Sequence, residues 1–574
     1  MSGNSLEHVL ETMETINVTL GWGALAVYSR GCLNEVLEHH YLQRLGDWNS
    51  LPRFAANIRR EDGSRTQLQA IEFGVPRLSF ASATTQDRRV QVTLPILSGV
   101  YRHESPSADE KLQYFVIDES MGLAVDVDVS FDVVAGRGRQ LLMLDLCKAV
   151  ETRCNLGPGG MNDAHLAAEL LRWFGNLKDF QSQFVLAEAD SQGGDYWTPT
   201  EVRVYTQAAP GAEASEALTH GDGALLMFFK VKGRTRDGLA PSADFPFLVV
   251  DEMQGQHYPV TVVLDRGLSH LSGNLLDKLS FPPVPSAFVE QARYEPFDTA
   301  LFGGLVAQEA VFTVDAPEHP VLAGSSHRFI MRDQQGQPVE ATRWSASGLE
   351  GQSGEYGDFD REGVYQAASL ERLKREDPVI VVTARLYRDG MVYQASRRAR
   401  VATDVFELQP EVAITTPTAP IDLHLSGAGT SLPWDVLDER HGRLDRHNDT
   451  QATFVPDAIV GRKGLAVQQV RVCSEHGPRF SIVLANGSQL LSVRPEVFRK
   501  VDYRESLRLE EQDVSFMSEA TRRWRLFGVG TLSEDGCFTA PSSGAPAFSV
   551  VTCEIEQHGV VLATGYNVLQ VGRL

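Results

Sequence analysis

The sequence predicts an α+β fold: an N-terminal elongated antiparallel sheet wrapped on amphipathic helices, followed by three all-β sandwiches. Three observations lead to this prediction. Tryptophans recur at an even spacing in the C-terminal half, and long runs of alternating apolar and polar residues fill the N-terminal half. Three N-terminal segments also carry apolar residues at helical spacing.

Composition limits the class of protein and its partners. The chain has 574 residues, 43% of them hydrophobic and 22% charged, which suggests about three to five globular domains. A formal net charge of -22 repels phosphate backbones and anionic membrane surfaces, so nucleic acid is not an expected partner. No run approaches the roughly 20 apolar residues of a membrane helix, so no membrane span is expected.

The N-terminus lacks the features of a secretory signal. Acidic "LEHVLETMET" precedes the first short apolar patch, where a signal would carry Lys or Arg. We therefore expect a chain that is cytoplasmic as synthesised, without a Sec signal, and that needs a non-classical route for any export.

The six cysteines show no CxxC spacing, which predicts reduced thiols rather than a zinc framework or a disulfide scaffold. Two pairs are close in sequence, Cys147 with Cys154 and Cys537 with Cys553. Whether either pair forms a disulfide under oxidation stays open at this stage.

Trp344, Trp434 and Trp524 are each 90 residues apart and begin similar stretches. Each is followed by a polar or glycine-rich turn region and then by an aromatic residue that leads into another turn. A β-rich run, a tight turn containing glycine and a further strand come next, which is the pattern of a β-hairpin. The aromatics are in "VYQAAS", "TFVPDA" and "CFTAPS", at Tyr365, Phe454 and Phe538.

The third copy, "WRLFGVGTLSEDGCFTAP" followed by "VVTC", resembles the signature of bacterial immunoglobulin-like domains. The second copy departs from it, since it lacks the Asp-Gly before its aromatic. The resemblance implies Ig-like repeats at 310–405, 406–495 (divergent) and 496–574, acting as a spacer or as a docking arm for a protein partner. One large aromatic per sandwich is normally core, so we expect the three tryptophans at equivalent buried positions rather than in a ligand site.

The N-terminal half is predicted to contain long strands and three helices. "LAVDVDVSFDVV" from Leu123 alternates without error, and further strands are expected at 89–101, 224–233 and 246–253. Helices are expected at 29–45 behind Ser29, at 162–177 behind Asn162, and at 265–279. The stretch "FPPVPSAFVEQARYEPFD", proline-rich at its start, is expected to form a semi-rigid joint, and residues 286–309 are expected to link this domain to the repeats.

A curved sheet around leucine-rich helices, with "VTVVLDRGLSHLSGNLLDKLSF", resembles the tubular lipid-binding (TULIP) superfamily and its members from neurotoxin gene clusters. The resemblance covers 1–285 and implies an apolar groove for a lipid or other hydrophobic small molecule. The alternative is that the same leucine stripes fill the core and leave no groove. The residues expected at the groove are Leu33, Leu37, Tyr41, Leu271 and Leu275.

No catalytic signature is present in the sequence. A GxSxG elbow, an HExxH helix, a Walker A loop and a Rossmann fingerprint are all missing. His39 and His40 are adjacent on the expected helix, so they point to different sides and are poorly placed to share a metal. We therefore expect no catalytic residue, no metal ligand and no cofactor.

Three classes of function remain open. The sequence favours a non-enzymatic binding protein that holds a hydrophobic ligand in its N-terminal domain, with the Ig-like repeats as an arm. The first alternative is a structural or adhesive component without a ligand. The second is a hydrolase with Ig-like accessory modules.

Overall fold

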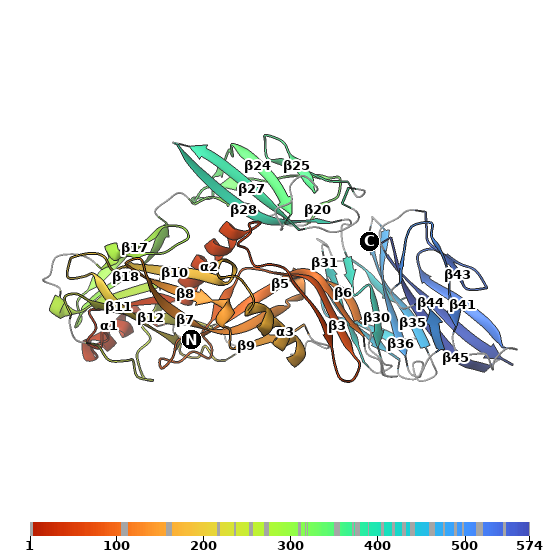
Figure 1. Ribbon diagram of the computed structural model, residues 1–574, viewed down its shortest axis with the longest axis horizontal. Helices are drawn as coiled ribbons and strands as arrows, with labels where there is room; N and C mark the ends of the chain where they lie inside the picture. The colour runs from red at the N-terminus through yellow and green to blue at the C-terminus, as the bar shows by residue number, and fades with distance from the viewer. Residues whose placement is uncertain are drawn as a thin grey trace.

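The computed structural model of the chain is elongated, with the N-terminal half at one end and the last strands at the other (Figure 1). The described residues are 4–104, 113–156, 163–214, 219–234, 237–251, 257–268, 275–307, 311–315, 317, 320–348, 356–369, 372–373, 379–388, 390–402, 407–415, 419–426, 432–436, 442–457, 465–474, 477–486, 491–495, 499–511, 520–542, 547–558 and 560–572.

The fold is mostly β, so the predicted α+β class is wrong. Within the described residues there are four α-helices. These are α1 (Leu6–Thr15), α2 (Arg30–Arg44), α3 (Ala164–Phe174) and α4 (Asp179–Ser182).

The helices at 29–45 and 162–177 are present, whereas the described parts of 265–279 form only short 3₁₀ turns, at Arg266–Leu268 and Leu276–Lys278. Asp265 accepts a hydrogen bond from the backbone N–H of Gly267, as a helix N-cap does, but in the described residues that follow, the backbone forms only these single turns. Ser29 caps α2 as expected. Asp163 caps α3.

One sheet of the N-terminal half has six strands and is apolar on both faces. Its strand β12, next to the edge strand β11, is almost entirely buried, because each face of the sheet packs against other elements. In order across the sheet the strands are β11 (Pro199–Ala208), β12 (Gly223–Val231), β1 (Ala24–Ser29), β15 (Val260–Leu264), β18 (Thr299–Ala307) and β17 (Ser286–Tyr294).

The second sheet has 14 strands and begins in the N-terminal half. Its path there is β16 (Leu279–Ser280), β10 (Gln183–Asp190), β8 (Arg139–Asp145), β7 (Ala124–Gly136), β5 (Arg89–Glu104) and β6 (Gln113–Asp118), with β2 (Phe54–Arg59), β3 (Arg65–Phe73), β4 (Arg77–Ser79) and β9 (Glu151–Cys154) paired alongside. The alternating burial of β7 confirms the strand predicted from Leu123.

The main core lies between these two sheets, and α2 and α3 contribute apolar residues to it. The opposite face of the six-stranded sheet is covered by α1 and by residues 245–251 and 257–258, which include the two-stranded sheet of β13 (Val250–Asp251) and β14 (His257–Tyr258). In its described part, 246–251, the expected strand at 246–253 is a two-residue pairing.

Residues 286–309, expected to be a linker, contain β17 and β18. These strands complete the six-stranded sheet, since β18 pairs with β15 and β17 pairs with β18. Proline-rich sequence precedes β17, but the apolar β18 is a buried strand of the N-terminal half.

The C-terminal half is built from all-β repeats, which confirms this part of the prediction in its coarse form. We name three modules by their strands. Module 1 contains β19 (Thr313–Val314), β20 (Val321–Leu322), β21 (Ser326–Arg328), β22 (Met331–Arg332), β23 (Pro338–Val339), β24 (Arg343–Gly348), β25 (Gly357–Phe359), β26 (Val364–Ala367), β27 (Val379–Arg388) and β28 (Met391–Ala402). Module 2 contains β29 (Glu407–Gln409), β30 (Val412–Thr415), β31 (Ile421–Ser426), β32 (Trp434–Val436), β33 (Gly442–Arg446), β34 (Gln451–Pro456), β35 (Leu465–Ser474) and β36 (Gly477–Asn486). Module 3 contains β37 (Leu491–Arg494), β38 (Arg499–Val501), β39 (Ser506–Arg508), β40 (Glu510–Glu511), β41 (Thr521–Gly528), β42 (Thr531–Leu532), β43 (Cys537–Thr539), β44 (Ala547–Gln557) and β45 (Val560–Val571).

The three modules share one strand arrangement. In each, an early strand runs parallel to the second strand of a long hairpin: β20 with β28, β30 with β36, and β37 and β38 with β45. In each, the tryptophan strand pairs antiparallel with the first strand of that hairpin.

The repeated aromatics take equivalent places in this arrangement. Tyr365, Phe454 and Phe538 are fully buried. Trp344, Trp434 and Trp524 are all only half-buried and pack at the margin of their module's core, so the expectation of buried indoles holds only in part.

The 14-stranded sheet continues from the N-terminal half into module 2. Strand β6 pairs with β30, with Tyr114 opposite Val412, and the path then runs through β36, β35 and β32. Modules 2 and 3 share an apolar cluster, and the ring of Tyr114 lies 4.8 Å from that of Phe548 in module 3. The N-terminal half, module 2 and module 3 are therefore joined by backbone pairing and by packing.

Candidate functional site

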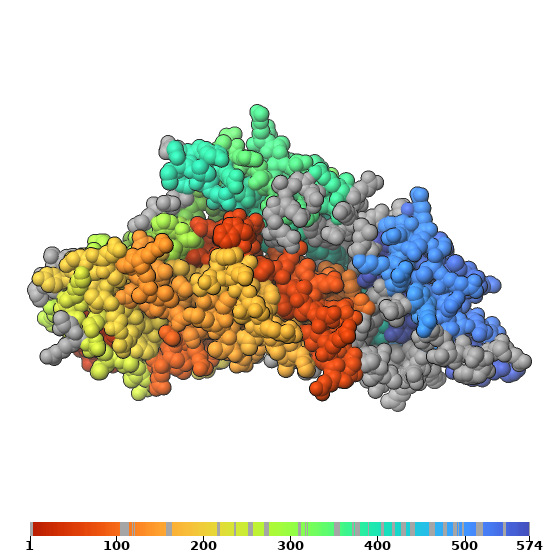
Figure 2. Space-filling view, viewed as in Figure 1, coloured from red at the N-terminus to blue at the C-terminus, as the bar shows by residue number. Residues whose placement is uncertain are grey.

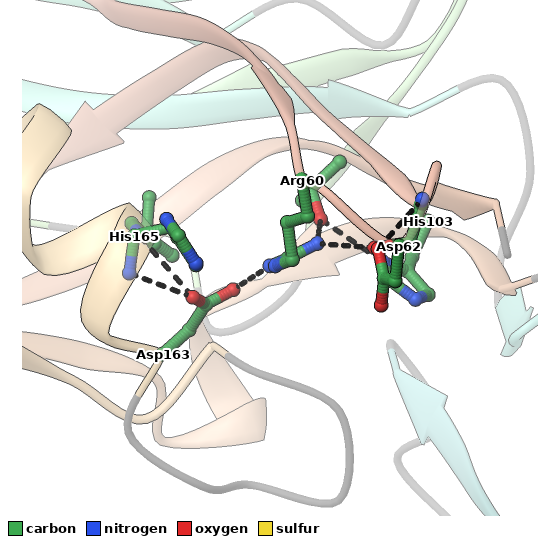
Figure 3. Close-up of polar contacts among 8 residues, drawn as sticks. Arg60, Asp62, His103, Asp163 and His165 are labelled. Carbon is green, nitrogen blue, oxygen red and sulfur yellow. Dashed lines mark hydrogen bonds and ion pairs between the residues drawn. The ribbon is translucent and has the colours of Figure 1, made fainter.

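A partly buried polar cluster in the N-terminal half lies where the β2–β3 hairpin meets the start of α3 (Figure 3). The guanidinium of Arg60, at the end of β2, forms an ion pair with the carboxylate of Asp163. Both side chains are largely buried. The pair therefore joins the tip of the hairpin to the first turn of the helix.

Asp163 has a second role in the same place. Its Oδ1 accepts hydrogen bonds from the backbone N–H groups of His165 and Leu166, at 3.0 and 3.3 Å (Figure 3). These N–H groups have no partner within the helix, and a carboxylate at a helix N-terminus is favoured by the helix dipole. One side chain thus both caps α3 and binds Arg60.

Arg60 also reaches toward β3 and β5. It donates to Thr66 Oγ1 at 2.8 Å, and the same oxygen lies 2.9 Å from Nδ1 of His103. At the turn, hydrogen bonds from the Ser64 side chain and backbone N–H lower the pKa of the Asp62 carboxyl. Burial first, and the nearby Asp163 second, raise the pKa of the Tyr101 phenol.

The cluster is built for holding elements together rather than for catalysis. A threonine beside a histidine is a possible nucleophile and base, but Thr66 is completely buried and its oxygen already accepts from Arg60. A substrate has no access to that oxygen. Within the described chain, no group of three or more His, Cys, Asp or Glu side chains is placed to hold a metal ion.

The five residues expected to line a lipid groove do not share one environment in the structure. Leu33, Leu37 and Leu275 are buried in the main core between the sheets, and Leu271 lies outside the described residues. Tyr41 is half-buried on α2, beside charged residues of module 1. The structure thus brings three of the five together in packed core, and the groove stays a prediction from sequence.

The adjacent histidines of α2 lie in different environments. His40 is buried, and its Nε2 lies 2.7 Å from the carbonyl oxygen of Val185 on β10. His39 is half-buried on the neighbouring position of the helix. The guanidinium of Arg44, one turn later, lies 4.5 Å from the ring centroid of Phe184, so α2 is fixed to β10 by two side chains.

All six cysteines are free. Burial raises the pKa of Cys154 and of Cys553 to about 12, which keeps both thiols protonated and poorly nucleophilic at neutral pH.

Sequence reasoning missed the exposed apolar residues at the ends of the long hairpins. Tyr387, Met391 and Val392 are exposed where β27 turns into β28, and Val560, Val561 and Leu562 are exposed at the start of β45. Phe480 is exposed near the same place in module 2. The sequence does contain a signal for them, namely closeness to the glycine of an expected hairpin turn. Each of these residues lies within four positions of Gly390, Gly477 or Gly559.

A second exposed feature is an aromatic pair next to α2. Trp48 is 71% exposed, and its ring packs edge-on against that of Phe180, with 4.5 Å between centroids. No helix in the described part of the chain is long and apolar enough to cross a lipid bilayer.

No family model and no curated protein matches the chain. Solved structures that match in part include extracellular domains 3-5 of Drosophila OTK (9% identity, 46% of this chain and 98% of that chain, TM-score 0.18). Others are three N-terminal domains of the bacteriophage RB49 outer capsid protein Hoc (13%, 46% and 99%, TM-score 0.17) and titin domains A168-A170 (13%, 46% and 97%, TM-score 0.13). TM-scores this low carry no argument about the present chain, whose repeat architecture rests on its own strand pairing.

Proposed function

We propose that this protein is a non-enzymatic structural or adhesive component whose modules present apolar hairpin tips to a protein partner. We define the hairpin tips as Tyr387, Met391 and Val392 of module 1 and Val560, Val561 and Leu562 of module 3. The observation that carries the proposal is their recurrence at the equivalent place in two modules.

Single exposed apolar residues are normal on protein surfaces, whereas clusters of them mark interaction sites. Burying a fully exposed Val, Met or Leu side chain contributes about 1.5–3 kcal/mol. Three partly exposed residues at one tip therefore supply several kcal/mol to an interface of modest size. A protein partner suits such a tip, because the formal charge of -22 opposes binding to anionic membranes and nucleic acids.

The rest of the chain supports a scaffold role. Backbone pairing between β6 and β30 and the apolar cluster shared by modules 2 and 3 hold the tip of module 3 at a fixed distance from the N-terminal half. The lipid-binding function that the sequence favoured has no supporting observation, since Leu33, Leu37 and Leu275 lie in packed core.

The test is affinity capture from the producing organism, with the wild type and a variant in which Met391, Val392, Val560, Val561 and Leu562 are changed to Ser or Thr. A matched control is Leu239→Ser, because Leu239 is 72% exposed but lies outside the modules. The proposal expects a protein that the wild type and the control capture and the tip variant loses. Equal capture by all three, or a lipid as the only bound species, would argue against it.

A further inference from the structure

Module 1 is attached to the rest of the molecule differently from modules 2 and 3. In the described part of the chain, its apolar cluster contains only residues of module 1, from Phe312 to Val401. Figures 1 and 2 show it standing to one side of the long axis, above the place where α2 lies. It therefore docks without sharing a hydrophobic core with its neighbours.

A buried ion pair lies at this contact. Nε of Arg398, on β28, is 2.7 Å from Oε1 of Glu72, on β3, and the two side chains are 19% and 8% exposed. Ser98 Oγ donates to the other carboxylate oxygen of Glu72 at 2.9 Å. Glu119 adds a second, exposed carboxylate 3.8 Å from the same guanidinium.

Other contacts lie near the pair. Val381 of β27 lies against Gly46, just beyond the end of α2, where an added Cβ would be 3.4 Å from Cβ of Val381. Tyr41 of α2 faces the same contact, next to Arg397 and Arg398 of module 1 and Glu72 and Glu119 of the N-terminal half, and its burial raises the pKa of the phenol. Two residues after Arg398 on β28, Arg400 binds both carboxylate oxygens of Glu407, on β29 of module 2, at 2.9 Å.

An ion pair in this position makes docking depend on charge. Removing one partner of a buried pair leaves the other charge without compensation, which is strongly unfavourable in a fixed structure. Here the remaining charge can return to water if module 1 moves away, because no shared apolar core holds the module in place. We propose that module 1 is a reversibly docked arm, held on α2 by the Glu72–Arg398 pair, and that neutralising either residue releases it.

Release has two structural consequences. It uncovers Tyr41, and it moves the hairpin tip of module 1 relative to the rest of the molecule, whether or not that tip binds a partner. The contact at Arg400 and Glu407 remains as the joint about which the module turns.

The experiment compares the full-length wild type with Glu72→Gln, which keeps the shape of the side chain and its acceptor for Ser98 but removes the charge. Hydroxyl-radical footprinting of Tyr41 and small-angle X-ray scattering report docking. The expected result is a several-fold rise in Tyr41 labelling and a larger maximum dimension. The matched control is Asp315→Asn, which breaks an ion pair of 2.8 Å with Arg332 inside module 1 and should change neither readout.

Two further variants separate release from unfolding. Exchanging the charges, Glu72→Arg with Arg398→Glu, should restore both readouts to wild-type values. A disulfide between Gly46→Cys and Val381→Cys, whose Cβ separation is near that of natural disulfides, should suppress Tyr41 labelling in the Glu72→Gln background. Gly46→Cys alone controls for strain, because Gly46 has a φ of +79°.

The proposal is overturned if Glu72→Gln is folded and both readouts equal those of the wild type. It is also overturned if the disulfide forms and Tyr41 labelling stays high, since the tyrosine is then exposed by local unfolding rather than by movement of the module.

Discussion

The indole of Trp524 packs on Gly536, the left-handed glycine of the turn that precedes Phe538. A Cβ at Gly536 would lie 2.9 Å from Cε2 of Trp524, and Gly363 has the same relation to Trp344, at 3.0 Å. Both glycines have φ values close to +80°, at +82° and +83°. The tryptophan and the turn glycine are one packing unit, which explains why they recur together in the sequence.

Gly536→Ala should lower the free energy of unfolding of module 3 by about 2–4 kcal/mol. A residue with a Cβ disfavours the left-handed backbone conformation, and the added Cβ would also crowd the indole of Trp524. The matched control is Gly336→Ala in module 1, whose φ is +72° but whose Cβ would meet nothing within 4 Å. Gly336→Ala should lower the free energy of unfolding only by the cost of the left-handed backbone conformation, about 1–2 kcal/mol. Urea unfolding followed by tryptophan fluorescence measures both, and equal losses would show that the indole contact adds nothing.

His40 makes stability depend on pH. Burial lowers its pKa from 6.5 to about 4, opposed in part by the hydrogen bond to Val185. The unfolded chain therefore binds a proton in this window that the folded chain does not, so the free energy of unfolding falls as pH drops from 6.5 to about 4. The loss amounts to at most about 3 kcal/mol.

His40→Gln keeps a donor for the Val185 carbonyl and should flatten that pH dependence in denaturant titrations at several pH values. His39→Gln removes only the smallest of the causes that lower the pKa of His40 and should change the pH dependence much less than His40→Gln does. An unchanged pH profile in His40→Gln would mean that other groups cause it.

The Arg60–Asp163 pair should stabilise the folded protein more than a surface ion pair does. Asp163→Ala removes the cap of α3 and leaves the largely buried Arg60 without its carboxylate, so we expect a loss of about 3 kcal/mol. Arg139→Ala breaks an exposed pair with Glu188 and should cost less than about 1 kcal/mol. Thermal unfolding of the two variants gives the comparison, and similar melting temperatures would contradict the clamp role of the cluster.

The sequence predicted those features that local patterns encode. The alternation of β7, the helix behind Ser29 and the tryptophan repeat were all read correctly, because periodicity and capping reflect local geometry. In the described parts of 265–279, short 3₁₀ turns are found where a helix was expected, with Leu268 and Leu275 buried, since the spacing of apolar residues alone does not distinguish a helix from such turns.

Contacts between segments that are far apart in the sequence could not be predicted from local patterns. Nothing near Tyr114 or Val412 signals that β6 and β30 pair, and Glu72 and Arg398 are 326 positions apart in the sequence. The second repeat differs in structure too: Nε1 of Trp434 donates to the carbonyl oxygen of Asp449 at 3.3 Å, and none of the described glycines lies against its indole.

Leu37 distinguishes a filled core from a groove. The side chain is fully buried among apolar residues of both sheets, so Leu37→Trp should overpack the core and cost about 1–3 kcal/mol. Leu42→Trp, at a half-buried position of the same helix, is the matched control and should cost less. A melting temperature of Leu37→Trp equal to or above that of the wild type would mean that empty space lies beside Leu37.

Native mass spectrometry of the purified full-length chain, followed by organic extraction, tests the central claim most directly. A scaffold whose N-terminal core is filled by its own side chains should give the mass of the polypeptide alone and an extract without stoichiometric lipid. A lipid bound at one molecule per chain and recovered in the extract would contradict the account, because the two sheets would then enclose a ligand site.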